Sequence, residues 1–581
     1  MDRRTLLRFL TCAGPFSWLP RRTLEGANRL LTSAFSNKSE RPSGRQGLYF
    51  AKKAHVPIAI PHFDELRSQL PAPIDDKHPL WIETYWKAWQ LAFRNFHEPG
   101  PDSGFVSWYI AYPHWHTICL WDSCFMSMFC NYAYPLVPGI SNLDNFYAKQ
   151  HQDGEICREI ARHTGLDSWP NTEDKPLYSR WGWPAYNERP IHEPESEQNL
   201  PVIYKGRQIP FPNPVLTLDG LDHPIPAWAE LEHYQIVGDK NRLEEVWEPL
   251  RHYYDALHKY LRQGNGLYVT DWASMDNSPR NVYLKGGGTA IDTSSEIVLF
   301  ARHLSQIAQI LGKHKEAEVY STDSEKLARQ INRLMWDENR KFYFDLQLDG
   351  KRVPIMTIAA FWTLLANVAS RRQAAYLVAE LENPNTFGPL NLVPSLAANQ
   401  PSYSRVGRYW RGSVWVPTNT MIIRGLENYG YHDIARKIAL NYLNLVANVF
   451  KKTGTIWENY APDEVQQGQP AQPDFVGWSG LGPIHYMFEY NLGLKPDAPH
   501  NELVWHLEAR GHIGCERYRF NGHIVSLRAN QSSSGKVQIH IHSDGSFILR
   551  LRYYGSEKTL SIRAGDQRFE FSPGSPELKR N

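Results

Sequence analysis

The feature that most limits how this chain can fold is a series of helix-length amphipathic segments that occur in pairs. The two members of a pair carry apolar residues at helical spacing, and a short turn separates them, as at Gly238, Gly312 and Gly430. The spacing predicts paired helices over residues 226–237 and 241–263, 293–311 and 314–335, 357–369 and 371–382, and 413–428 and 431–451. Further segments over 80–95, 121–134, 138–151 and 482–491 extend the series to about a dozen helices.

Such pairs bury their apolar faces against neighbouring pairs, either in an open solenoid or in a closed ring. A solenoid is built from repeats of similar length, and this sequence shows no fixed period. We therefore predict a mainly α fold, in which residues 77–495 form a closed toroid of helical hairpins.

The two ends of the chain have a different character. Apolar runs near residues 524–527, 537–542, 547–552 and 559–562 predict β-strands, and hence a small β-sandwich-like module over residues 496–581 that caps the toroid. Residues 41–76 are rich in proline and charge and are expected to form an N-terminal arm. Residues 1–40 open with Arg3 and Arg4 followed by leucines. This segment resembles a twin-arginine export signal and predicts a periplasmic protein, with a basic cytosolic leader as the alternative.

The composition excludes several classes of function. Lys and Arg total 63 against 61 for Asp and Glu, and the formal charge of +2 gives no bulk attraction to nucleic acid or to an anionic membrane. The sequence has no run of about 18 apolar residues, as a membrane-spanning helix would require. The six cysteines form no CxxC pair, and there is no nucleophile elbow, Walker loop or dinucleotide fingerprint. The sequence therefore indicates neither a metal nor a cofactor.

Aromatic residues are unusually frequent, with 20 Trp and 30 Tyr. Their flat apolar faces suit either a bulky core or platforms on which sugar rings stack. Many lie with Asp, Glu, Arg and Asn in the loops between helix pairs, and we expect the loops that follow the inner helices to converge on one face of a toroid. The candidate carbohydrate-binding residues in the loops are Trp121, Asp122, Gln150, Asn277, Arg280, Trp410, Arg411, Trp415, Trp457 and Trp478.

Two carboxyl groups in these loops fit the requirements of glycosidic cleavage. One carboxyl must be protonated to donate to the leaving oxygen, and the other must be ionised to activate water or to attack the sugar. Aromatic surroundings raise the pKa of the acid, whereas Arg and amide neighbours keep the base charged. Asp276, in a loop crowded with apolar residues, is the candidate acid. Glu458, between Trp457 and Asn459, is the candidate base.

Five segments resemble the signature loops of family 63 glycoside hydrolases, and more closely those of their mannosylglycerate-hydrolase-type and trehalase-like branch. They are Asp-Asn-Ser-Pro-Arg at 276–280, Tyr-Trp-Arg-Gly-Ser-Val-Trp at 409–415, Trp-Glu-Asn-Tyr at 457–460, Trp-Asp-Ser at 121–123 and Gly-Trp-Ser at 477–479. The resemblance runs in the same order over about residues 80–492.

This resemblance implies an (α/α)6 toroid and inverting hydrolysis of an α-linked glucoside or mannoside by single displacement. It assigns the general acid to Asp276 and the general base to Glu458, which in an inverting enzyme stand about 6.5–9.5 Å apart. It also implies sugar contacts from Asp122, Arg280, Trp410 and Arg411.

The sequence departs from the family pattern at two places that select the aglycone. Asp-Trp-Ala-Ser at 271–274 stands where relatives often have Glu-Ser-Gly, and the stretch 459–475 is long and polar. The sugar, the linkage and the aglycone therefore stay open. A lyase or a phosphorylase on the same toroid, and a sugar-binding protein without activity, are the alternative functions.

Overall fold

The computed structural model of the protein describes residues 49–169 and 223–580, apart from short gaps at 51–52, 58–59, 61, 113–114, 153, 271–274, 285–287, 348, 508–510, 532–535, 554 and 572–578. Between 170 and 222 it describes three short strands, β7 (Ile191–His192), β8 (Val202–Tyr204) and β9 (Arg207–Ile209). The predicted export segment at 1–40 and the segment 271–274 lie outside the described residues.

The helices predicted from periodicity are confirmed, and most of them begin and end close to the expected residues. One exception is the segment predicted over 357–369, which forms the 3-10 turn η5 (Ile358–Phe361) followed by the single turn α12 (Trp362–Leu365). The last helix is a π-helix, η7 (Gly482–Asn491), preceded by η6 (Trp478–Leu481). The other long helices are α4 (Pro79–Ala92), α5 (Leu120–Cys130), α6 (Asn142–Ala148), α7 (Pro226–Val237), α8 (Lys240–Leu261), α10 (Ile291–Ile310), α11 (His314–Met335), α13 (Arg371–Glu382), α14 (Val416–Asn428) and α15 (His432–Thr453).

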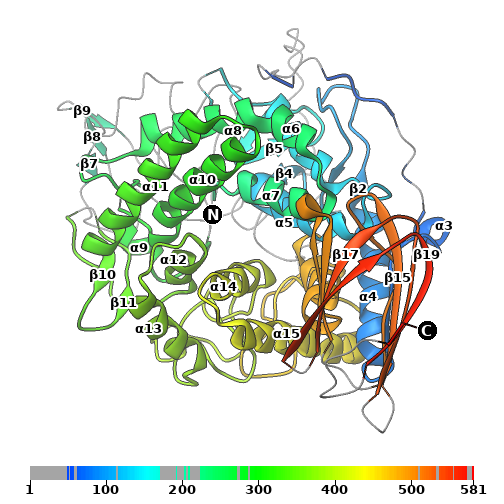
Figure 1. The fold of residues 1–581 in the computed structure, drawn as a ribbon. Coiled ribbons are helices and arrows are strands. Elements are labelled where there is room, and N and C mark those ends of the chain that lie inside the picture. The colour runs from blue at the N-terminus through cyan, green and yellow to red at the C-terminus, as the bar shows by residue number, and fades with distance from the viewer. Residues whose placement is uncertain are drawn as a thin grey trace, which may run out of the picture.

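The helices are arranged in a closed ring (Figure 1). Helices α5, α7, α10, α12 and α14 pack in that order, and η6 joins α14 back to α5 to complete an inner circle. Helices α8, α11, α13 and α15 lie outside it, and α4 near the beginning of the chain packs on α15 and η7 near its end. A mainly helical fold with a ring-shaped core is therefore confirmed.

Burial explains which helix takes which place in the ring. Every residue of α5 and of η7 is buried, as expected for a helix that has neighbours on all sides. The outer helix α11 is buried along one stripe only, at Ala317, Tyr320, Ser324, Leu327, Ala328, Ile331 and Met335. Two inner helices also need a close approach, because a Cβ at Gly425 of α14 would meet Leu364 of α12 at 2.8 Å.

The C-terminal region is antiparallel apart from one parallel strand pair. One sheet has the order β1-β14-β15-β16-β19-β20 and the other β12-β13-β17-β18, in which β13 and β17 run parallel. The bounds are β12 (Leu494–Asp497), β13 (Glu502–His506), β14 (His512–Phe520), β15 (His523–Gln531), β16 (Val537–Ser543), β17 (Phe547–Tyr553), β18 (Ser556–Ile562), β19 (Gly565–Phe571) and β20 (Lys579–Arg580). Alternating burial along β16 and β17 gives each sheet an apolar inner face.

The segment predicted as an N-terminal arm contributes a strand to this region. Strand β1 (Ala72–Asp75) pairs with β14, in a register that places Ile74 opposite Gly514. The arm also contains the short helix α3 (Phe63–Leu66).

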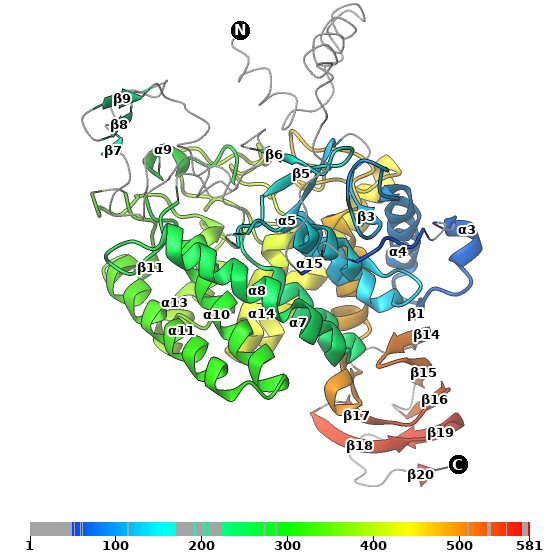
Figure 2. The same ribbon diagram turned by 90° about the horizontal axis from the view of Figure 1, so that it is seen from above.

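The two mouths of the ring differ (Figure 2). The loops around α9 (Asn281–Leu284), β5 (Glu159–Ala161) and β6 (Asp167–Trp169) lie at one end, and the C-terminal strands lie toward the other. Among the helices that the structure describes, none combines the length and the hydropathy needed to cross a lipid bilayer.

Candidate active site

The candidate residues gather at one mouth of the ring, but they adjoin the other ends of the inner helices from those expected. They lie in loops that precede the inner helices rather than follow them. Asp122 is in the first turn of α5, Trp415 immediately precedes α14, and Trp478 begins the η6 turn that leads into η7. The loop of Asp276 leads through α9 into α10. Each of these side chains is therefore positioned by the N-terminal end of an inner helix.

Glu458 follows the outer helix α15 and is held in place on both sides. Its Oε1 accepts a hydrogen bond from the Tyr409 hydroxyl at 2.9 Å, and its Oε2 accepts one from the Gln472 backbone N–H at 3.2 Å. Its own backbone N–H donates to the Gln472 carbonyl at 3.0 Å. The next turn of the loop pairs with the segment before α14 through Val414 and Tyr460. The carboxylate is thus fixed in one orientation.

The electrostatics of Glu458 connect it to Asp276. Burial raises the pKa of the Glu458 carboxyl from 4.5 to about 7, and the negative charge of Asp276 adds to the increase. The hydrogen bonds from Tyr409 and Gln472 act in the opposite direction, because they stabilise the charged form. The two candidate carboxyl groups, 182 positions apart in the numbering, therefore lie within electrostatic range of each other.

Asn277 fastens the Asp276 loop to the loop before α14. Its side chain donates to the Arg408 carbonyl at 3.0 Å and accepts from the Trp410 backbone N–H at 2.9 Å. In return, Arg411 Nε donates to the Asn277 carbonyl at 3.1 Å. Arg411 also lines a hollow of about 600 Å³ formed with residues 401–408. In this structure Asn277 and Arg411 thus position the two loops against each other.

Arg280 takes a different position from the one expected of a sugar-binding residue. Its side chain is completely buried, and its guanidinium forms ion pairs with Asp292 at 2.5 Å and with Asp345 at 3.3 Å. Asp345 also accepts from the backbone N–H of Ile291, the first residue of α10. A guanidinium enclosed in this way ties the Asp276 loop to the start of α10. We therefore treat Arg280 as a positioning residue, not as a sugar contact.

Four of the predicted tryptophans form a continuous row. Trp410 stacks on Trp415 with ring centroids 4.5 Å apart and planes 7° apart. Trp415 contacts Trp478 at 6.0 Å, and Trp478 contacts Trp121 at 6.0 Å. The indole nitrogen of Trp478 also lies 3.4 Å from the carbonyl oxygen of Glu458. The row therefore forms an aromatic wall beside the candidate base.

Two predicted residues make structural contacts instead. The Gln150 amide donates to the carbonyls of Gly154 and Pro249, both at 2.9 Å, which ties its loop to the outer helix α8. The indole N–H of Trp457 donates to Thr453 at the end of α15. Neither contact directs the side chain to the row of tryptophans.

Sequence reasoning missed Tyr112 as part of this site. Its ring stacks on Phe475 with centroids 3.7 Å apart, and its hydroxyl accepts from the Trp478 backbone N–H at 3.2 Å. Burial raises the pKa of Tyr112, and the charges of Asp122 and Glu458 add to the increase. The hydroxyl therefore lies within electrostatic range of both carboxylates. The Gly-Trp pair at 477–478 was the available signal, because a Cβ at Gly477 would meet the Tyr112 oxygen at 2.0 Å.

Tyr409 and His223 are also new to the site. Tyr409 was visible only as part of a motif, and its role depends on a contact with Glu458, 49 positions further on. His223 packs against Trp121 at 5.5 Å and shares a hydrogen bond of 2.7 Å with Glu296 of α10. In the part of the chain that the structure describes, no group of His, Cys, Asp and Glu residues is arranged to hold a metal ion.

A helical ring in which two carboxyl groups lie within electrostatic range of each other, beside a row of tryptophans, has features that glycosidic cleavage requires. Residues 220–479 match the family described as the mannosylglycerate hydrolase MGH1-like glycoside hydrolase domain. This match confirms the resemblance to glycoside hydrolases that the motifs indicated.

Individual relatives agree with the family match. A probable mannosyl-oligosaccharide glucosidase of Schizosaccharomyces pombe is 26% identical over 63% of this chain and 48% of its own length. A mannosylglycerate hydrolase of Rubrobacter radiotolerans is 32% identical over 24% of this chain and 31% of its own. The matched parts thus span less than half of either relative.

A solved structure has a similar fold. The GH63 mannosylglycerate hydrolase from Thermus thermophilus, in complex with Tris and D-glycerate, superposes with a TM-score of 0.51 and 19% identity. The match covers 69% of this chain and 99% of that one. At this identity the likeness concerns the fold alone.

Proposed function

We propose that this chain is an inverting glycoside hydrolase that cleaves an α-linked glucoside or mannoside by single displacement. Asp276 is the general acid and Glu458 the general base. The observation that carries the proposal is the pair itself: a buried carboxyl with a raised pKa, and a second carboxyl whose charge contributes to that pKa. The activities after which the two relatives are named, those of a glucosidase and a mannosylglycerate hydrolase, support an α-glucoside or α-mannoside as substrate.

Glu458 has the properties that a base for water requires. Its two oxygens each accept one hydrogen bond, which fixes the direction of the free lone pairs. A pKa of about 7 makes it a stronger base than an ordinary carboxylate, and the base still ionises near neutral pH. Water approaching this carboxylate loses a proton to it while the oxygen attacks the anomeric carbon.

The acid must hold a proton while the base is charged. Repulsion between the two carboxylates disfavours the state in which both are ionised. In the proposed reaction the single proton of the pair lies on Asp276 when Glu458 is charged. Asn277 and Arg411 hold the Asp276 loop against the loop before α14. In the proposed reaction Asp276 gives its proton to the glycosidic oxygen as the bond to the anomeric carbon breaks.

The walls of the sugar subsite follow from the same geometry. We propose that the faces of Trp121, Trp410, Trp415 and Trp478 exclude water from the sugar, and that Asp122 accepts hydrogen bonds from its hydroxyls. A hydroxyl in the wrong orientation leaves a buried polar group without a partner, which costs roughly 1–3 kcal/mol. This loss of binding free energy is how the subsite discriminates glucose from its epimers.

The experiment that tests this function uses a panel of α-linked disaccharides, with NMR detection of the anomer released first. We expect the β-anomer to appear first and to mutarotate later. The immediate release of the α-anomer would contradict inversion. No turnover of any α-glucoside or α-mannoside would contradict the substrate class.

Two variants separate the roles of the carboxyl groups. Asp276→Asn is expected to lose hydrolysis of glycosides but to keep part of its activity on an α-glycosyl fluoride, because fluoride leaves without a strong acid. Glu458→Gln is expected to lose activity on both, because the attacking water has no base. Glu464→Gln, an exposed carboxylate in the same segment, is the matched control. Full activity in either active-site variant would remove that residue from the mechanism.

We propose two further properties that the described residues support. The helix pairs correspond to an (α/α)6 toroid, because six inner elements close the ring. Export through the Arg3-Arg4 segment to the periplasm suits a protein whose described cysteines, Cys119, Cys124, Cys130, Cys157 and Cys515, are buried away from oxidants. Cell fractionation of a variant with both arginines replaced by Lys tests export, since it should leave the protein in the cytoplasm.

A further inference from the structure

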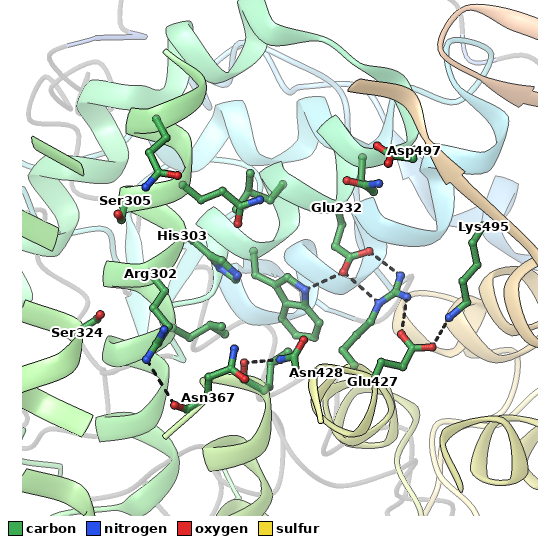
Figure 3. Close-up of a pocket in the computed structure, with 18 of the residues that line it drawn as sticks. Glu232, Arg302, His303, Ser305, Ser324, Asn367, Glu427, Asn428, Lys495 and Asp497 are labelled. Atoms are coloured by element: carbon green, nitrogen blue, oxygen red, sulfur yellow. Dashed lines mark hydrogen bonds and ion pairs between the residues drawn. The ribbon is translucent and has the colours of Figure 1, made fainter. Parts of the chain in front are cut away.

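A large cavity lies on the side of the ring toward the C-terminal strands (Figure 2), and Figure 3 shows residues that line it. Its volume is about 750 Å³, within the range of small-molecule sites. Residues of α7, α10, α11, α12 and α14 line it, together with residues of η7, β12 and β13. The candidate residues of the active site precede the N-termini of the inner helices, and none of them lines this cavity.

An aromatic layer separates the two mouths. Trp228 lines the rear cavity and packs against Phe125 with centroids 5.6 Å apart. Phe125 in turn packs against Trp121 of the front site at 5.0 Å. Both Phe125 and Trp228 are buried. The rear cavity is therefore a compartment of its own, not an extension of the active site.

One wall of the rear cavity is a compact network of charges. Arg424 forms ion pairs with Glu232 at 2.8 Å, Glu427 at 3.3 Å and Glu489 at 2.6 Å. Lys495 forms a further pair with Glu427. The carboxylates on this wall are acceptors for any hydroxyl group that enters, and Figure 3 shows Glu232 and Glu427 on the same side as Lys495.

The facing wall contains buried polar atoms to which the protein itself gives no partner. Arg302 Nε and His303 Nδ1 are buried atoms with no hydrogen-bond partner among the described residues. Arg302 also takes part in no ion pair in the described part of the chain, and its one hydrogen bond there goes to the Asn367 carbonyl at 3.4 Å. A half-buried guanidinium in this state favours an added acceptor oxygen.

The charges around the cavity decide which kind of ligand fits. Arg302, Arg424 and Lys495 give three positive charges, and Glu232, Glu427, Glu489 and Asp497 give four negative charges, so the lining carries one net negative charge. An anion such as phosphate is therefore disfavoured. Exposed amides, which both donate and accept, occupy the rim at Gln235, Gln306, Asn367 and Asn428.

A ligand that offers acceptors to one wall, donors to the other and no charge is a sugar or a related polyol. We propose that the rear cavity is a second carbohydrate site, which binds a neutral sugar without cleaving it. The two mouths of the ring would then have different roles, catalysis at the front and retention of carbohydrate at the rear. This inference does not depend on the proposed reaction, because no residue of the rear cavity takes part in it.

The test measures sugar binding by the full chain with calorimetry and ligand-detected NMR, using trehalose and maltotriose as probes. The Glu458→Gln background prevents turnover during the measurement. We expect Arg302→Leu and Gln306→Leu each to weaken one class of sites about tenfold, the effect of losing one hydrogen bond to a charged or exposed polar group. Arg329→Leu, at an exposed position on α11, is the matched control and should change nothing.

Each outcome bears on the proposal. Gln306 is exposed, so its variant keeps the test valid even where Arg302→Leu fails to fold. Sugar binding that neither rear variant weakens, or no binding of either probe, would overturn the proposal. Binding of inorganic phosphate that depends on Arg302, without binding of the sugars, would show an anion site instead. In the chain with Glu458 intact, kcat and KM should be unchanged by both rear variants, and this measurement separates a failure here from a failure of the proposed reaction.

Discussion

Replacing Glu458 with Gln is expected to stabilise the folded protein relative to the wild type as the pH rises, while it removes activity. Glu458 is 4% exposed, and the pKa of its carboxyl is raised from 4.5 to about 7 by burial and by the charge of Asp276. Because the folded pKa lies above the unfolded one, protonated Glu458 favours the folded state. That contribution is complete below about pH 4.5, falls between about pH 4.5 and 7, and is gone above it.

The magnitude follows from the same pKa. A rise from 4.5 to about 7 corresponds to about 3 kcal/mol, at about 1.4 kcal/mol for each tenfold change in the ionisation constant. Gln does not titrate, so the variant escapes this loss. Its amide also accepts less well from Tyr409 and Gln472 together, but that cost of roughly 1–3 kcal/mol is the same at every pH.

The assay is thermal unfolding by calorimetry, with wild type and variant compared between about pH 4 and about pH 9. The difference in Tm should move in favour of Glu458→Gln between about pH 4.5 and 7 and then stay constant. Glu464→Gln, whose side chain is exposed, should show no such trend. In an Asp276→Asn background the trend should shrink, because one source of the raised pKa is gone. A flat difference across this range would refute both the burial of Glu458 and its proximity to Asp276.

Three further predictions address the supports of the site and of the fold. Tyr409→Phe removes a hydrogen-bond donor that favours the charged form of Glu458, so the pKa of Glu458 should rise. The acidic limb of the pH profile of kcat/KM should then move about one pH unit higher. An unmoved limb would show that the hydroxyl does not act on the base. Arg280→Met leaves two buried carboxylates uncompensated and should cost about 3–5 kcal/mol by denaturant titration, and a loss below about 1 kcal/mol would contradict the ion pairs. Removal of residues up to Asp76 uncovers the edge of β14, so size-exclusion chromatography should show more self-association than in the full chain. An unchanged elution profile would show that β1 does not protect this edge.

The helices of this protein were predictable because their signal is local. An apolar residue every three or four positions fixes the face that a helix buries, and α11 shows that pattern in both sequence and structure. The order of the motifs along the chain also identified the loops of Asp276 and Glu458 correctly as neighbours. The prediction that the loops after the inner helices form the site was wrong, because periodicity does not indicate which end of a helix faces the site.

Long-range contacts account for what the sequence did not reveal. Strand β1 joins β14 across about 440 positions, so Ile74 reads as part of a polar arm until its partner is known. Tyr112 enters the site through a contact with Trp478, 366 positions away. Arg280 lies in a motif, but only the placement of Asp292 and Asp345 shows that its charge is already neutralised.

The parallel inner helices present opposite ends of their dipoles to the two mouths. The N-terminal ends of α5, α7, α10 and α14 lie at the front, and a helix N-terminus stabilises negative charge by about 0.3–1 kcal/mol in its first turn. The C-terminal ends lie at the rear, where they favour cations, and Arg302 and Arg424 stand there on α10 and α14. The dipoles do not outweigh the burial of Glu458, whose pKa stays raised to about 7. The ring thus permits carboxylates at the front while leaving one of them basic enough to activate water, and the same topology brings arginines to the rear cavity.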